Sequence, residues 1–116
     1  IWSAQPLRRG ARAALLDSRN KLFVSAVSVW EIVIKHALGK LKMARSPQTL
    51  VPEMIAATQA AELPIGHAHA LRVGRLPPHH ADPFDRLLIA QAQVERLTIV
   101  TADQRFSAYD VEVLKA

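Results

Sequence analysis

The amino-acid sequence predicts an α/β fold, a parallel sheet with helices on both faces. Stretches typical of strands alternate along the chain with stretches in which apolar residues recur at helical spacing. Such alternation favours crossover connections, and these make neighbouring strands parallel. A length of 116 residues and a hydrophobic content of 50% suit one domain over residues 1–116 with a core of its own.

The first expected elements are a helix, a strand and a second helix. Residues 7–19 form an amphipathic helical pattern with arginines on its solvent side. "KLFVSA" at 21–26 is typical of a strand. The second helix starts from either Ser25 or Ser28, and Gly39 is placed to cap its C-terminus.

The middle of the chain predicts a third helix, a short strand and a short fourth helix. The third helix covers residues 46–60 and begins with Ser-Pro, and Pro52 is expected near its first turn or at a kink. "AELPI" at 61–65 predicts a short strand. Residues 67–73 predict a short helix, which a proline-bearing connector follows.

The last third begins with a helix at 82–96. Its apolar residues leave little polar surface, which predicts that most of its sides are covered. "LTIVTAD" at 97–103 predicts a strand, "QRFSAYD" at 104–110 a turn, and "VEVL" at 111–114 a final strand.

Charge and composition narrow the classes of function. A formal net charge of +5 and a pI near 10.2 favour a polyanionic partner, although a merely soluble basic surface explains them equally well. Charged residues interrupt every apolar stretch before about 18 residues, so we expect no membrane span and a soluble, cytoplasmic protein. The absence of cysteine excludes disulfides and thiolate metal sites.

Two aspartates stand at the start of the helix expected at 82–96. Asp82 followed by Pro83 is typical of an N-terminal cap. Asp85 falls in the first turn, where the helix dipole favours a negative charge by about 0.3–1 kcal/mol. Capping therefore explains both acids, and a functional site is the alternative.

Three acids are expected at one edge of the sheet. Glu31 and Asp103 follow predicted strands and Asp85 begins a helix, and functional groups of such folds collect beyond the carboxyl ends of the strands. Gathered carboxylates repel each other unless a cation neutralises them, which predicts Mg²⁺ or Mn²⁺. Structural roles stay open: Glu31 fits a capping box if the helix starts at Ser28, and Asp103 suits the cap of a short turn helix.

The histidines suggest a zinc site less strongly. The candidates are the pairs His67 with His69 and His79 with His80. Neither pair has the i, i+4 spacing that directs two imidazoles to one helix face, and zinc needs three or four ligands. Loop histidines on a basic surface are the favoured interpretation.

Three segments together resemble one known family. "LFVSAVSVWEIVIKHALGKL", "LPPHHADPFDRLLIAQA" and "LTIVTADQRFSAYDVEVL" are similar to PIN-domain ribonucleases, specifically VapC-type toxins of type II toxin–antitoxin systems. The likeness covers nearly the whole chain. It implies a PIN-like fold and an Mg²⁺- or Mn²⁺-dependent endoribonuclease that an antitoxin inhibits.

The resemblance also assigns residues to roles. Glu31, Asp85 and Asp103 are the implied catalytic and metal-binding acids, and Asp82 is a less certain metal partner that caps the helix or holds a metal-bound water. Contacts to RNA are expected from Arg8, Arg9, Arg12, Lys35, Lys40, Lys42 and Arg45. Arg86 fits a phosphate contact and a simple surface role equally well. The family implies a homodimer and a VapB-like antitoxin.

Four apolar residues are candidate contacts for that antitoxin. Core packing is the favoured interpretation for Trp30 and Leu38, whereas Leu41 and Met43 fit the core and the antitoxin surface equally well.

One part of the family pattern has no counterpart here. Family members open with a hydrophobic strand that ends in an aspartate and lies in the middle of the sheet, whereas this sequence begins "IWSAQPL", which resembles the helix after that aspartate. The resemblance thus implies a PIN-like domain without its first, central strand, either a fragment or a truncated relative. Without that ligand we expect weaker metal binding.

Three hypotheses follow. The first is a metal-dependent endoribonuclease of the VapC type, inactive as it stands if the missing aspartate is essential. The second is a catalytically dead PIN-like module that binds an antitoxin or RNA. The third is an unrelated α/β domain whose acids are only helix caps.

Overall fold

The computed structural model describes residues 9–17, 19–79 and 81–116, and it confirms the α/β class. Strand β1 (Phe23–Ser25) pairs in parallel with β2 (Ala61–Leu63). Strand β3 (Ile99–Thr101) pairs in parallel with β4 (Val113–Lys115). A sheet lacking its central strand was expected, and the described strands form two separate pairs instead of one continuous sheet.

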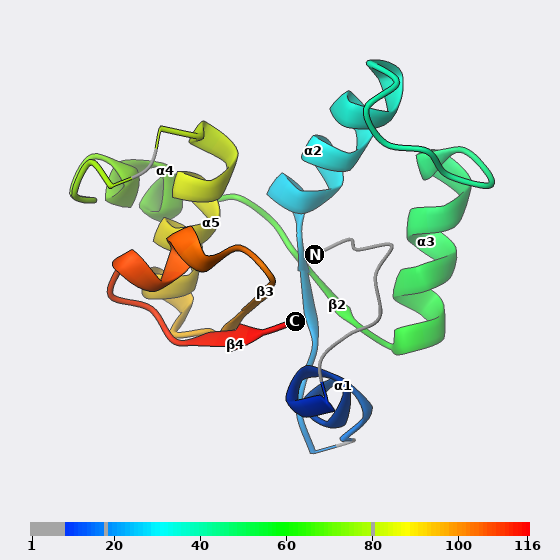
Figure 1. Cartoon of the computed structure of the whole chain (residues 1–116), viewed down its shortest axis with the longest axis horizontal. Coiled ribbons are helices and arrows are strands. Elements are labelled where there is room, and N and C mark those ends of the chain that lie inside the picture. The colour runs from blue at the N-terminus through cyan, green and yellow to red at the C-terminus, as the bar shows by residue number, and fades with distance from the viewer. Residues whose placement is uncertain (1–8, 18, 80) are drawn as a thin grey trace.

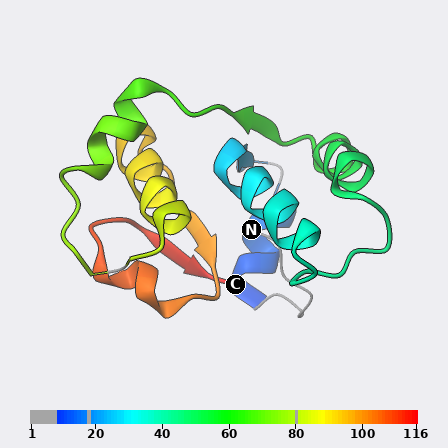
Figure 2. The ribbon, with the colours of Figure 1, turned by 90° about the horizontal axis from the view of Figure 1, so that it is seen from above.

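Five α-helices and a 3₁₀ helix are described around these strands. They are α1 (Arg9–Leu16), α2 (Ala26–Ala37), α3 (Pro47–Thr58), α4 (His67–Val73), α5 (Pro83–Glu95) and η1 (Gln104–Ala108). Helices α4, α5 and η1 lie with β3 and β4 on one side of the molecule, and α2 and α3 lie on the other (Figures 1 and 2). No described helix has the length and apolar character needed to cross a membrane.

Helix α2 begins at the earlier of the two serines considered. The Ser25 hydroxyl accepts a hydrogen bond from the Val27 N–H at 3.1 Å, so Ser25 is the N-terminal cap. Glu31 therefore lies in the second turn, and the capping-box interpretation of this residue is wrong. The last helical residue is Ala37 and Leu38 is the C-terminal cap. Gly39 follows at the helix end as expected, with a φ of +72° that suits glycine, and the Lys40 N–H donates to the Lys35 carbonyl.

Helix α3 begins at Pro47, where a missing N–H costs nothing. Pro52 lies inside the helix, beyond the first turn. Because proline has no N–H, the helical bond from residue 52 to the Gln48 carbonyl cannot form at this point. The helix ends at Gln59, which adopts a left-handed conformation with φ +55°.

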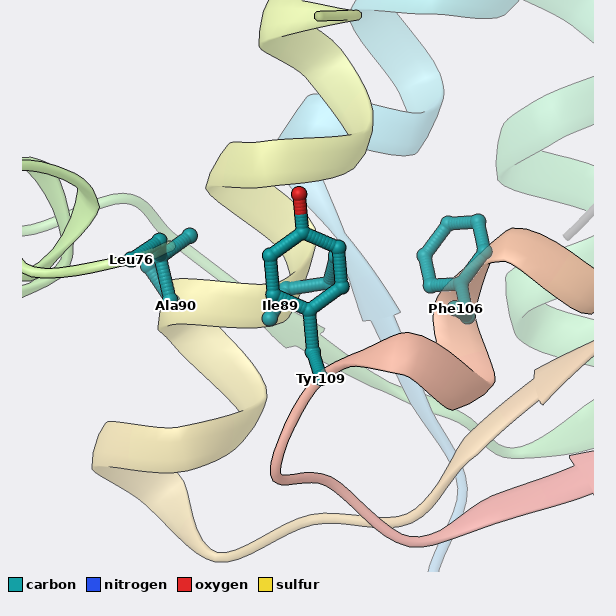
Figure 3. Packing of buried hydrophobic residues seen from close by; sticks show 5 residues of the cluster. All are labelled: Leu76, Ile89, Ala90, Phe106 and Tyr109. Atoms are coloured by element: carbon teal, nitrogen blue, oxygen red, sulfur yellow. The ribbon is translucent and has the colours of Figure 1, made fainter. Parts of the chain in front are cut away.

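The main hydrophobic core lies between α5, η1 and the end of the α4 segment. Its buried members are Leu76, Ile89, Ala90, Phe106 and Tyr109, and they face one another across these elements (Figure 3). Ile89 and Ala90 have no exposed surface, which confirms that α5 is covered on most sides. This core fixes α5 as the central helix of its side of the molecule.

His69 is a structural residue and not a surface histidine. It is 5% exposed, and its Nδ1 accepts a hydrogen bond from the Gly66 N–H at 2.9 Å. Its Nε2 then carries the proton and lies 2.8 Å from the Glu95 carboxylate. The expectation of a loop histidine is wrong here, because His69 joins the start of α4 to the end of α5.

A buried polar network joins the two sides of the molecule. The Ser25 hydroxyl donates to the Gln91 side-chain oxygen at 2.6 Å, and Gln91 Nε2 donates to the Pro64 carbonyl at 3.1 Å. Gln91 is 2% exposed, so water cannot replace these partners. The network thus ties the end of β1 to the middle of α5 and to the connector after β2.

Replacing Gln91 should therefore destabilise the fold. Gln91→Leu keeps the volume but leaves the Ser25 hydroxyl and the Pro64 carbonyl without their partner, so we expect a loss of about 2–4 kcal/mol in the free energy of unfolding. Urea denaturation measures it. Gln48→Leu, on the exposed start of α3, is the matched control and should change stability by less than about 0.5 kcal/mol. Equal effects in both variants would contradict the role of the network.

Candidate functional site

The start of α5 is built by a proline and a capping aspartate. Asp82 Oδ1 accepts hydrogen bonds from the Phe84 N–H at 2.9 Å and from the Asp85 N–H at 3.4 Å. Pro83 occupies the first helical position. The capping role predicted for Asp82 is confirmed, and the same cap fixes where the next carboxylate of the helix stands.

Three carboxylates meet at this helix start. Glu31, Asp82 and Asp85 each offer an oxygen, and these oxygens all lie within 4.8 Å of one another. Asp85 is 8% exposed, and the other two are half-buried. In the described residues this is the one group of acidic or histidine side chains that is close enough to hold a metal, and no described histidine belongs to it.

Helix α2 is held beside this helix start by an aromatic contact. The rings of Trp30 and Phe84 pack edge to face, with centroids 4.8 Å apart and an interplanar angle of 76°. Glu31 directly follows Trp30 in α2, and Asp85 directly follows Phe84 in α5. The contact therefore brings one acid of α2 and one of α5 to the same place.

The three acids fit a small divalent cation. Oxygens bound to one Mg²⁺ or Mn²⁺ at about 2.1 Å are roughly 3–4 Å apart. A spread of up to 4.8 Å is close to that separation, so modest side-chain rotation brings the oxygens into place. Hard carboxylate oxygens are also the donors that these ions prefer.

Asp103 has the capping role that was one of its two expected roles. It caps η1 by accepting the Arg105 N–H at 2.9 Å, and it forms an ion pair with the Arg105 guanidinium at 2.7 Å. It does not belong to the group of three acids in the described part of the chain. Glu31 and Asp85 thus lie together as expected, and Asp82, the less certain metal partner of the sequence analysis, is the third member of the group.

Arg105 interacts electrostatically with Asp103 and with two acids of the group, Asp82 and Asp85. The hydrogen-bonded carboxylate of Asp103 raises the pKa of the Arg105 guanidinium, and the charges of Asp85 and Asp82 raise it further. The sequence analysis missed Arg105 as a residue of this region. The sequence signal that could have indicated Arg105 is its position two residues after Asp103, a predicted cap.

Lys35 is a second cation beside the acidic group. Its Nζ is 3.0 Å from Glu31 Oε2, one helical turn earlier on α2. This hydrogen bond raises the pKa of Lys35, and the negative charges of Glu31, Asp82 and Asp85 add to the effect. The i, i+4 order of a glutamate before a lysine is the usual helical pairing, and it could have been seen in the sequence.

The sequence of the chain also matches the model of a known protein family. Residues 1–112 match the family model described as PIN domain.

The chain belongs to the PIN-domain family.

A similar protein is Ribonuclease VapC16 of Mycobacterium tuberculosis, which is 38% identical over 58 residues. Those residues are 50% of this chain and 41% of the relative, so the match spans less than half of that protein.

Arg86 of this PIN domain binds backbone carbonyls. Its guanidinium donates to the carbonyls of Pro77 at 2.9 Å, Val73 at 3.2 Å and Leu76 at 3.4 Å, and it lies 3.5 Å from the Tyr109 hydroxyl. These bonds tie the end of α4 and the connector after it to α5. The guanidinium thus has a structural role that the sequence analysis did not foresee.

The other expected RNA contacts differ in their surroundings. Lys40 and Lys42 are exposed just after α2, whereas Arg45 forms an ion pair with Glu53. Arg8 lies outside the described residues, and the side chains of Arg9 and Arg12 are not described.

The apolar candidates lie closer to the surface than expected. Trp30 is 57% exposed and Leu38 is 63% exposed, so the preference for core packing is wrong for both. Leu41 and Met43 are half-buried. A helical apolar stripe shows which residues share a face, but not whether another element covers that face.

Arg86→Met should unfold the domain more easily. It removes the bonds to the carbonyls of Val73, Leu76 and Pro77, so we expect a loss of about 2–3 kcal/mol and a fall in Tm of roughly 10 °C. Differential scanning calorimetry measures both. Arg75→Met removes the same charge at an exposed position and serves as control. An unchanged Tm for Arg86→Met would return this arginine to the RNA-binding candidates.

Proposed function

We propose that this PIN domain is the toxin of a VapC-type toxin–antitoxin pair, an Mg²⁺- or Mn²⁺-dependent endoribonuclease that hydrolyses RNA phosphodiester bonds. The observation that carries the proposal is the group formed by Glu31, Asp82 and Asp85 at the start of α5. Family membership and the likeness to a protein named a ribonuclease support the same chemistry.

The acids have two tasks in this proposal. Glu31, Asp85 and Asp82 hold the cation, and Asp103, the N-terminal cap of η1, is a further catalytic acid. The bound cation supplies an activated water and stabilises the negative charge that develops on the phosphate. The buried carboxylate of Asp85 keeps its position relative to the reacting phosphate, because the cap at Asp82 fixes the first turn of α5.

The RNA backbone is guided by basic side chains near the acids. Lys40 and Lys42 are exposed beyond the end of α2, the helix that carries Glu31. Phosphate contacts of this kind position a nucleic acid without reading its sequence.

The proposed partner is a VapB-like antitoxin. Trp30 and Leu38 expose apolar surface on α2, and the half-buried Leu41 and Met43 follow them along the chain. An apolar patch beside an acidic site suits a segment that blocks the site. A homodimer and a cytoplasmic location complete the proposal by analogy with the family.

Asp85→Asn tests the metal site. In the wild-type chain, Mn²⁺ should raise Tm by mass action, and Asp85→Asn should abolish that rise because a ligand charge is lost. Cleavage of a mixed RNA in Mn²⁺ should fall at least about 100-fold. Asp110→Asn, in the exposed loop after η1, is the matched control and should behave as wild type.

The same assay should be run with a second form of the chain, in which a hydrophobic strand ending in aspartate is joined before Ile1. We expect the extended form to cleave RNA faster, because it supplies the ligand that the family pattern implies. Absence of Mn²⁺-dependent cleavage in both folded forms would favour a catalytically dead module that binds antitoxin or RNA.

Lys40 and Lys42 are tested by salt dependence. Each phosphate contact to single-stranded RNA contributes about −0.7 to the slope of log K against log of salt concentration. Lys40→Ala and Lys42→Ala should each make the slope shallower by about that amount in a filter-binding titration. Arg19→Ala, beside α1, is the control, and a slope that changes equally in all three variants would refute a specific RNA path.

A further inference from the structure

Lys35 forms an ion pair with one carboxylate of the acidic group. Its ammonium lies 3.0 Å from Glu31 Oε2, and the Glu31 side chain is only 18% exposed while the Lys35 side chain is 51% exposed. Glu31 is at the same time one of the three carboxylates whose oxygens lie within 4.8 Å of one another. One carboxylate is thus shared between a lysine and the position of a cation.

A divalent cation and the Lys35 ammonium compete for that carboxylate. Like charges a few ångströms apart repel, so a cation that binds Glu31 weakens the ion pair with Lys35. The half-exposed lysine can leave, since it has a flexible four-carbon stem and reaches solvent. A released ammonium stays within one helical turn of the site, because Lys35 and Glu31 belong to the same rigid helix.

We infer that Lys35 is an internal counter-ion, which a divalent cation displaces from Glu31 and which then holds an RNA phosphate at the site. This inference rests on the proposed function and adds a positioning residue to it. Lys35 lies among the charges of the three carboxylates, whereas Lys40 and Lys42 are exposed beyond the end of α2. The raised pKa of Lys35 agrees with its place among these charges.

The inference predicts that removal of Lys35 has opposite effects on the affinity for metal and on the affinity for RNA. Lys35→Met removes the competitor, so Mn²⁺ should bind about 2- to 5-fold more tightly, the amount that a half-exposed ion pair is worth. The same variant lacks the ammonium that holds the phosphate, so RNA should bind about 3-fold more weakly. Lys35→Arg keeps the charge and should stay within 2-fold of wild type in both measurements.

Mn²⁺ binding is measured without any RNA, from the electron paramagnetic resonance signal of the free ion. RNA binding is measured in Ca²⁺, which also takes oxygen ligands, by the fluorescence anisotropy of a labelled single-stranded oligonucleotide. A denaturing gel verifies that the oligonucleotide stays intact. Lys21→Met is the control for the loss of one positive charge, because Lys21 precedes β1 at the end of that strand opposite to α2.

The outcomes separate this inference from the proposed function. If wild type binds Mn²⁺ but Lys35→Met does not bind it more tightly than Lys21→Met does, the inference is wrong and the proposed function stands. Weaker binding of both ligands by Lys35→Met would indicate a purely structural lysine and also overturn the inference. Tighter Mn²⁺ binding with unchanged RNA binding would overturn the phosphate role. If wild type binds no Mn²⁺, both proposals fail.

Discussion

The buried hydrogen bond between Ser25 and Gln91 is the constraint on which the site depends. Ser25 starts α2, and Glu31 follows it by six residues; Asp85 precedes Gln91 on α5 by the same six residues. At 1.5 Å per residue, each acid is about 9 Å along its helix from the bond. The two helices therefore bring their acids to one level, and the edge-to-face contact of Trp30 with Phe84 holds the helices together at that level.

Gathering three carboxylates around a buried position has a cost that nearby positive charge offsets. The N-terminus of α5 favours negative charge at Asp82 and Asp85. Lys35 and Arg105 bring full positive charges from α2 and η1. The basic character of the whole chain acts in the same direction at longer range. The N-terminus of α5, Lys35 and Arg105 thus offset part of the repulsion among the three acids.

Much of the fold followed from sequence patterns, and the sequence with its family resemblance also named Glu31, Asp85 and, less certainly, Asp82 as metal ligands. Pro83 after Asp82 and the glycine at position 39 are local signals, and the structure has the helix ends where these signals predicted them. Local patterns could not decide whether Asp82 or Asp103 lies closest to Glu31 and Asp85, because both residues are good caps. Asp103 was expected among the acids, yet it pairs with Arg105 two residues later.

Other errors came from contacts between distant segments. The carbonyls that Arg86 binds belong to α4 and the connector after it, and no spacing in the sequence indicates such partners. The exposure of Trp30 depends on which elements cover α2, and the apolar pattern of α2 is the same for a covered and an uncovered face. The division of the strands into two pairs likewise depends on neighbours that are remote in the chain.

The equal spacing of the two acids from the Ser25–Gln91 bond limits how this gene can change in length. One inserted residue turns a helix by about 100°, so an insertion between Ser25 and Glu31 would rotate that acid away from its partners. The same holds between Asp85 and Gln91. Deletions and insertions in an active lineage should therefore fall outside these two stretches, whereas single substitutions within them leave the spacing unchanged.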